Sequence, residues 1–154
     1  MEETILKVFA QSITRYFGTV APTPAHLGTP YLRGEGEPVG LDFSAVIGIT
    51  GSYRGNVYYT APRAKLEALL PFIGETRPDD RLCAELVGEI TNTISGNARA
   101  QLGGGFMIST PFIIEGRPLD IHTSRQAPCY ILPITWNQHL SRVLVSLEPG
   151  SSSP

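Results

Sequence analysis

The sequence has few cysteines and histidines, and those it has are scattered. The two cysteines, Cys83 and Cys129, form no Cys-x-x-Cys pair, and the three histidines, His26, His122 and His139, are equally dispersed. A structural zinc site needs ligands at closer spacing than this. We therefore expect no bound metal and no structural disulfide.

Clustered positive charge and long hydrophobic runs are absent as well. The formal net charge is −2, whereas nucleic-acid binding depends on clusters of Lys and Arg. No stretch approaches the ~20 apolar residues needed to span a bilayer. The N-terminal Met-Glu-Glu-Thr also lacks the positive region and apolar run of a signal peptide. These absences predict a cytoplasmic protein with neither nucleic acid nor membrane as a partner.

Length and composition fit one globular domain. The 154 residues are 42% hydrophobic and 17% charged, which is ordinary for a folded chain. A domain of this size buries about 70% of the surface that its unfolded chain exposes, so it needs no disulfides or metal ions to stabilise the fold. We expect a single domain over residues 1–148 and a disordered C-terminal tail over 149–154.

Two segments in the N-terminal half of the chain are predicted to be helical. In residues 3–17 apolar side chains recur at helical spacing, and Gly18 is a plausible stop. A shorter helix is expected to begin at Pro62 and run through Leu70, because proline fits the first helical turn.

The strongest helix prediction covers residues 78–102. Asp79 and Asp80 after a proline give a start signal, and the glycines from Gly103 end the helix. The apolar stripe consists of Leu82, Leu86, Ile90, Ile94 and Ala98. A triple glycine also invites a phosphate-loop interpretation, but it ends this helix instead of beginning one and lacks the Gly-Lys-Ser/Thr that would follow.

Most of the remaining segments are predicted to form β-strands. Residues 39–60 predict a β-hairpin turning at Gly51 to Gly55, and residues 19–38 are expected to hide a short strand near 31–33. Further strands are expected over 106–115, 118–124, 128–136 and 140–147. This order of elements predicts an α+β fold, an antiparallel sheet with helices on one face. The apolar edge formed by the last two strands should be paired or covered, most simply across a homodimer.

A polar stripe marks the exposed side of the 78–102 helix. At ~100° per residue, Glu85, Glu89, Asn92, Gly96 and Arg99 fall along one surface. Glycine, Asn and Thr are poor helix formers, so a solvated face would normally hold Lys, Glu, Gln or Ala instead. Such a stripe fits a surface approached by another molecule, although solvated polar residues and close helix packing are the ordinary explanations.

The stretch Glu85 to Asn97, ELVGEITNTISGN, resembles the signature helix of the CheX/CheC family of chemotaxis phosphatases. In that family an acidic or hydroxyl residue is followed by Glu four positions later and by Asn three positions after that. Glu89 and Asn92 match the catalytic pair, whereas Glu85 stands where Asp or Ser is usual.

Two more segments, 51–57 and 108–116, are similar to the same family, so the resemblance covers roughly residues 40–147. The single Glu-x-x-Asn motif is typical of CheX-like members, and the first helix has only Gln11 and Thr14 at the nearest comparable positions.

The resemblance implies a phosphatase that hydrolyses the aspartyl phosphate of a CheY-like receiver domain and ends a chemotaxis or two-component signal. Asn92 would orient a water molecule, and Glu89 would pair with the receiver's lysine. Glu85, Gly88 and Gly96 would contact the partner. The chain would need no cofactor of its own, because the receiver supplies Mg²⁺, and CheX-like relatives imply a homodimer.

Two alternatives remain open at this point. A non-catalytic module of the same fold would bind a receiver or scaffold without hydrolysis. A small-ligand sensor using residues 19–38 as a lid has no positive support in the sequence. No arrangement of Ser, His and Asp suggests a hydrolase triad.

Overall fold

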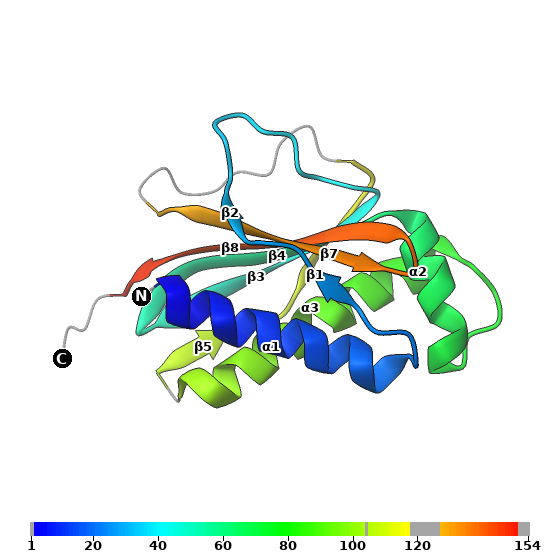
Figure 1. Cartoon of the computed structure of the whole chain (residues 1–154), viewed down its shortest axis with the longest axis horizontal. Coiled ribbons are helices and arrows are strands. Elements are labelled where there is room, and N and C mark those ends of the chain that lie inside the picture. Colours follow the sequence, from blue (N-terminus) through cyan, green and yellow to red (C-terminus); the bar gives the residue numbers. More distant parts are fainter. Residues whose placement is uncertain (1, 104, 118–126, 151–154) are drawn as a thin grey trace.

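In the part of the chain that the structure describes, an eight-stranded antiparallel sheet carries helices on one face (Figure 1). The computed structural model describes residues 2–103, 105–117 and 127–150. The predicted α+β class, with helices on one face of an antiparallel sheet, is confirmed.

The helices are α1 (Glu2–Val20), α2 (Arg63–Leu69), the 3₁₀ turn η1 (Leu70–Ile73) and α3 (Asp80–Leu102). The strands are β1 (His26–Leu27), β2 (Tyr31–Leu32), β3 (Phe43–Gly51), β4 (Tyr53–Ala61), β5 (Phe106–Ile108), β6 (Phe112–Glu115), β7 (Cys129–Trp136) and β8 (His139–Pro149). The main path across the sheet is β1-β7-β8-β4-β3-β5, with β2 also on β7 and β6 also on β3.

The predicted hairpin is β3 and β4, whose last pair before the turn is Ile49 with Gly55. Both strands extend into the turn region because other strands pair with them there: β5 pairs with the end of β3, and β8 pairs with the start of β4. The positive φ of Gly51, 101°, lets the chain reverse at this point.

Helices α1 and α3 lie side by side on the same face of the sheet. Their apolar stripes form the main core, which includes Phe9, Ile13 and Phe17 from α1 and Leu86 and Ile90 from α3. The 3.6-residue periodicity of both sequences therefore predicted the buried faces correctly.

Helix α1 continues past the predicted stop at Gly18. The Ala21 N–H still donates to the Phe17 carbonyl at 3.1 Å, and the helix ends before Pro22. A single exposed glycine costs a helix only about 1 kcal/mol, whereas the residue before a proline is driven out of the helical region. The proline, and not the glycine, ends α1.

The other face of the sheet has its own small apolar cluster, made of Val39, Tyr58, Cys129, Ile131 and Leu144. The chain between α1 and β3 runs over this face (Figure 1). Strand β2 confirms the predicted strand near 31–33, and β1 was not predicted. Both pair with β7, so the apolar edge expected to meet a second copy is covered by the chain's own strands.

Helix α3 begins and ends as its sequence predicts. The Asp79 carboxylate accepts a hydrogen bond from the Arg81 N–H at 2.7 Å, which caps the N-terminus. At the other end the Gly103 N–H donates to the Arg99 carbonyl at 3.0 Å, and Gly103 has a φ of 98°. Both ends of the helix are therefore fixed by local sequence.

At the C-terminal end, β8 continues through Pro149, and the Gly150 N–H donates to the Ser52 carbonyl at 2.9 Å. The paired region thus extends past the predicted domain end at residue 148. The strand expected over 118–124 and the tail residues 151–154 lie outside the described residues. Within the described ranges, every helix lacks the length or the apolar character needed to cross a bilayer.

Candidate functional site

Three polar side chains lie exposed in one row along α3: Glu85, Glu89 and Asn92. From helix geometry, Glu89 and Asn92 are about 60° apart around the axis and about 4.5 Å apart along it. The predicted pair is therefore brought together on the outer side of a helix whose inner side is buried. A carboxylate and a carboxamide project to solvent from one rigid support.

The opposite side of α3 explains that rigidity. Leu86, Ile90 and Ile94 are each at most 1% exposed. Thr91 and Ser95 are buried as well, and the Thr91 hydroxyl donates to the Val87 carbonyl at 2.7 Å. These two small residues beside the pair therefore face the core and leave no space on the exposed side of the helix.

The two glycines of the motif have different surroundings. Gly88 is buried, and a Cβ at this position would lie 3.0 Å from Ile113 Cδ1. Gly96 is partly exposed, and a Cβ there would meet nothing within 4 Å. Both were predicted to contact a partner. Gly88 instead lets the chain at Pro111 and Ile113 approach the helix, so only Gly96 leaves open space.

The charges along the stripe differ in how they are paired. Glu85 lies 3.8 Å from Arg81 in an ion pair whose two side chains are largely exposed. Such a pair contributes little to stability because solvent screens it. Among the described residues, no cation forms an ion pair with Glu89, and Asn92 makes no side-chain hydrogen bond. These two groups are available to another molecule.

Sequence reasoning missed one residue at the site, Tyr16 of α1. Burial raises the pKa of Tyr16 well above its ordinary value, and the negative charge of Glu89 raises it further. Tyr16 therefore lies within electrostatic reach of Glu89 and stays a neutral phenol. Its position beside the apolar stripe of α1 was the only signal in the sequence, and it did not indicate this electrostatic interaction.

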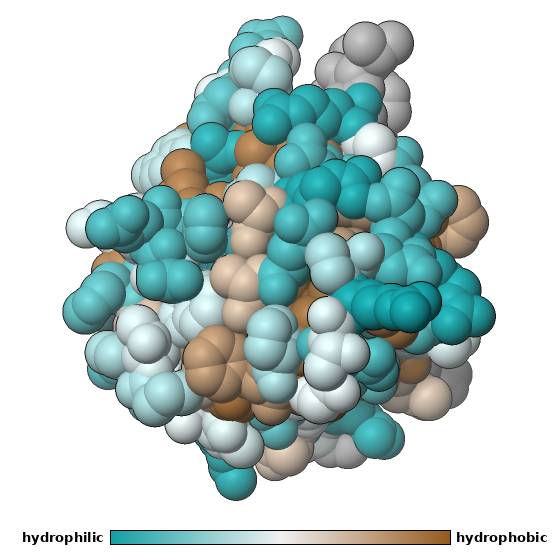
Figure 2. Space-filling model, turned by 90° about the vertical axis from the view of Figure 1, so that its right-hand side faces the viewer, coloured by the Kyte–Doolittle hydropathy of each residue, from teal (hydrophilic) through white to brown (hydrophobic). Residues whose placement is uncertain are grey.

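The end of the molecule at the right of Figure 1, where α2 lies, has a mostly polar surface. Figure 2 shows that hydrophilic groups cover most of this end, with apolar groups between them. Phe72 and Ile73 of η1, which follows α2, are 47% and 39% exposed, so this end also exposes apolar side chains.

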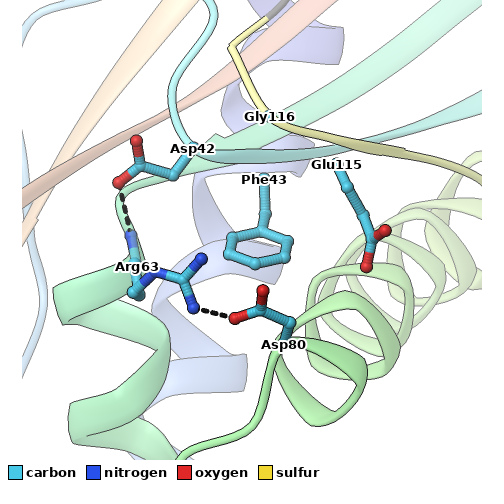
Figure 3. A pocket seen from close by; sticks show the side chains of 6 residues that line it. All are labelled: Asp42, Phe43, Arg63, Asp80, Glu115 and Gly116. Atoms are coloured by element: carbon cyan, nitrogen blue, oxygen red, sulfur yellow. Dashed lines mark hydrogen bonds and ion pairs between the residues drawn. The ribbon is translucent and has the colours of Figure 1, made fainter.

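A separate pocket of about 450 Å³ lies at the N-terminal end of α3, lined by Asp42, Phe43, Arg63, Asp80, Glu115 and Gly116 (Figure 3). Arg63 lies at one side, and its guanidinium reaches toward Asp80 and the Phe43 ring (Figure 3). Its backbone N–H donates to Asp42 at 2.8 Å, its guanidinium pairs with Asp80, and its Cζ lies 5.2 Å above the Phe43 ring.

Arg63 engages two of the three carboxylates that line this pocket, Asp42 and Asp80. The Arg63 guanidinium lowers the pKa of Asp80, and the Arg63 backbone N–H lowers the pKa of Asp42. Across the described residues, no three His, Cys, Asp or Glu side chains gather into a set that could hold a metal ion. We interpret this pocket as a link between α2, α3 and the strands, not as a site of chemistry.

Comparison with known proteins identifies the family. The model of the family described as chemotaxis phosphatase CheX matches residues 43–135, more than half of the chain. The chain belongs to the CheX family. The matched region includes the β3–β4 hairpin and all of α3, so it contains Glu89 and Asn92.

Solved structures of similar proteins agree with this assignment. The CheX protein of Desulfovibrio desulfuricans is 31% identical, with a TM-score of 0.83 over 94% of this chain and 99% of that one. A CheC-like protein of Shewanella oneidensis is 26% identical, with a TM-score of 0.81 over 96% and 100%.

A more distant CheX protein, from Borrelia burgdorferi, shares the fold. It is 18% identical, with a TM-score of 0.77 over 93% of this chain and 97% of that one, and its structure is a complex with CheY, BeF3 and Mg²⁺. No curated protein sequence matches this chain.

Proposed function

We propose that this protein is a phosphatase that hydrolyses the aspartyl phosphate of a CheY-like receiver domain. One observation carries the proposal: Glu89 and Asn92 lie exposed and adjacent on a helix whose other side is fully packed. Membership of a family of chemotaxis phosphatases supports it. The Borrelia relative, solved with CheY, supports the choice of a receiver as the partner.

The Asn92 carboxamide acts on the attacking water. It offers both an acceptor oxygen and donor hydrogens, so it can hold a water in line with the scissile P–O bond. Phosphoryl transfer needs positioning and charge stabilisation more than covalent help from the protein. An oriented water is therefore the main contribution that this chain makes, because well-oriented reactants lower the barrier substantially.

Glu89 acts in docking. Its carboxylate is too anionic to lie next to a phosphoryl group unless a cation intervenes. The receiver's active-site lysine is such a cation, and no ion pair among the described residues competes for Glu89. The receiver also contributes the Mg²⁺, so this chain needs no cofactor of its own.

The direct test is to time phosphate loss from a panel of phosphorylated receivers with and without the protein. We expect the wild type to accelerate hydrolysis for at least one receiver, and the Glu89→Ala/Asn92→Ala double variant to leave each receiver at its own rate. Binding of a beryllofluoride-loaded receiver without any acceleration would reject the enzyme and favour a non-catalytic module.

We also propose that the protein is a cytoplasmic homodimer, as CheX-like relatives suggest. The β7 edge cannot form the dimer interface, because β1 and β2 already pair with it. Strand β6 pairs only with β3 among the described residues, and Phe112 on it is 67% exposed. Such an edge is open to pairing with another strand. Light scattering at tens of micromolar measures the mass, and a strictly monomeric mass would reject the dimer.

A further inference from the structure

A hollow of about 280 Å³ lies beside the Glu89–Asn92 pair, lined by Gly96, Arg99, Ala100, Gly103 and Ile108. Gly96 is one helical turn after Asn92, and Arg99 is about 10 Å beyond Asn92 along the axis. The hollow therefore continues the exposed row of the proposed site toward the C-terminal end of α3.

Internal packing does not explain why Gly96 is a glycine. Gly88 needs its missing side chain because Ile113 lies against it, but a Cβ at Gly96 would meet nothing within 4 Å. Glycine inside a helix costs about 1 kcal/mol relative to alanine. Gly96 weakens the helix without any gain in packing, and its effect is to keep the floor of the hollow open.

Arg99 provides a fixed positive charge at the rim. Its Nε donates to the Phe106 carbonyl at 3.0 Å, which holds the guanidinium against the β5 strand. No carboxylate of the described residues forms an ion pair with Arg99, and the side chain is exposed. The remaining guanidinium N–H groups form a fork suited to a carboxylate.

The charges along the outer side of α3 thus have an order. Arg81 offsets Glu85, so among the described residues the unpaired charges are the negative one of Glu89 and, about 15 Å beyond it, the positive one of Arg99. A complementary surface must present a cation at Glu89 and an anion at Arg99. Complementary charges of this kind determine orientation and the choice of partner more than overall affinity.

We propose that the hollow receives an acidic side chain of the receiver, whose carboxylate pairs with Arg99 while its methylene groups lie over Gly96 and Ala100. This inference rests on the proposed function and adds a determinant of specificity to it. Receivers that present Asp or Glu about 10 Å from the phosphorylation site on the docking face are accepted. Receivers with Lys or Arg at that point are rejected.

The test measures both dephosphorylation kinetics and binding to a beryllofluoride-loaded receiver. Arg99→Glu should raise KM and Kd about tenfold and leave kcat unchanged, because Glu89 and Asn92 are intact. Arg99→Gln should raise KM and Kd about threefold. The difference from the wild type should shrink at high salt, which screens exposed charges. Arg77→Glu, in the exposed loop before α3, makes the same change in net charge and should leave both constants unchanged.

The size of the hollow is tested separately. Gly96→Ala narrows the hollow and should raise Kd about threefold, whereas Gly96→Leu fills it and should raise Kd about tenfold, both at every salt concentration. Charge reversal of the receiver's acidic residue to Lys should restore binding to Arg99→Glu.

Failure of this inference is distinguishable from failure of the proposed function. If the wild type accelerates hydrolysis while Arg99→Glu matches Arg77→Glu, the hollow has no role and the phosphatase stands. If the wild type binds receivers without hydrolysing the phosphate, the phosphatase proposal fails. The Kd values of the wild type, Arg99→Glu and Arg77→Glu then still show whether Arg99 takes part in docking. If the wild type binds no receiver, both proposals fail.

Discussion

Helices α1 and α3 make an instructive comparison, because they lie side by side on the same face of the sheet and bury matching apolar stripes. Their exposed residues even share one spacing. The series Lys7, Gln11, Thr14 and Gly18 on α1 corresponds to Glu85, Glu89, Asn92 and Gly96 on α3.

The chemistry of the two rows differs although the scaffold does not. The Thr14 hydroxyl donates to the Ala10 carbonyl of its own helix at 3.0 Å, so it is already engaged. Asn92 makes no side-chain hydrogen bond within the described ranges, and Glu89 forms no ion pair there. An amphipathic helix is therefore not enough for a site. The outward side chains must also be reactive and left unpaired.

The largest expected difference between the helices is at Asn92 and Thr14. Asn92→Ala should abolish acceleration of receiver dephosphorylation, returning the rate to the receiver's own, because the water is no longer oriented. Binding should survive. Thr14→Ala is the matched control on α1 and should keep full activity. Stopped-flow phosphate release measures both, and equal losses in the two variants would refute the distinction.

The second largest effect is expected at Glu89 of α3, compared with Gln11 at the corresponding position of α1. Glu89→Ala should weaken receiver binding by about 2–5 kcal/mol, the usual cost of truncating one partner of a buried interfacial charge pair. Gln11→Ala should leave affinity unchanged. Calorimetric titration with a beryllofluoride-loaded receiver measures both values. Unchanged affinity in Glu89→Ala would remove this residue from the docking surface.

A third prediction concerns the inner side of α1, where it meets a buried cation. Lys65 of α2 is fully buried; its Nζ donates to Ser141 Oγ at 2.6 Å and lies 4.3 Å from the centre of the Phe17 ring. Burial lowers the pKa of Lys65 from 10.5 to about 7. No carboxylate contributes to the shift, so the charged form is unfavourable in the folded state.

The sign of the pH effect follows from proton binding. Between pH 7 and about 10 the unfolded chain keeps a proton on Lys65 that the folded chain has released, so the free energy of unfolding rises with pH. The slope from this group is at most about 1.4 kcal/mol per pH unit.

Urea unfolding at several pH values from roughly 7 to 8 measures this slope, before the cysteines of the unfolded chain titrate near their ordinary pKa of about 8.5. Lys65→Met should be more stable at pH 7 and should lose the slope. Ser141 keeps a partner in this variant, because the Tyr59 hydroxyl donates to it at 3.2 Å. An identical slope in the variant would show that Lys65 is not the responsible group.

The smallest expected effects compare the two glycines of α3. Gly96→Ala should stabilise the protein by up to about 1 kcal/mol, since alanine favours the helix and meets no neighbour. Gly88→Ala should gain less by about 1 kcal/mol, because its Cβ would lie 3.0 Å from Ile113 Cδ1 and that side chain must shift. Thermal unfolding measures the difference, and equal gains in the two variants would contradict the packing difference.

Elements whose signals are local could be predicted from the sequence. The helical period, the Asp79 cap and the glycine end defined α3, and the same period predicted that Glu89 and Asn92 share its outer side. The hairpin of β3 and β4 followed from alternation and turn residues. These features depend on residues within a few turns or one hairpin, which is the range over which sequence patterns carry physical meaning.

Features that join distant residues could not be predicted in this way, because they depend on how the whole chain packs. The covering of β7 by β1 and β2, the proximity of Tyr16 to Glu89 and the contact of Ile113 with Gly88 each link separate parts of the chain. The hollow beside Gly96 likewise needs Ile108 of β5 next to α3. Packing across the core sets these distances, so two glycines that look alike in the sequence have opposite surroundings in the fold.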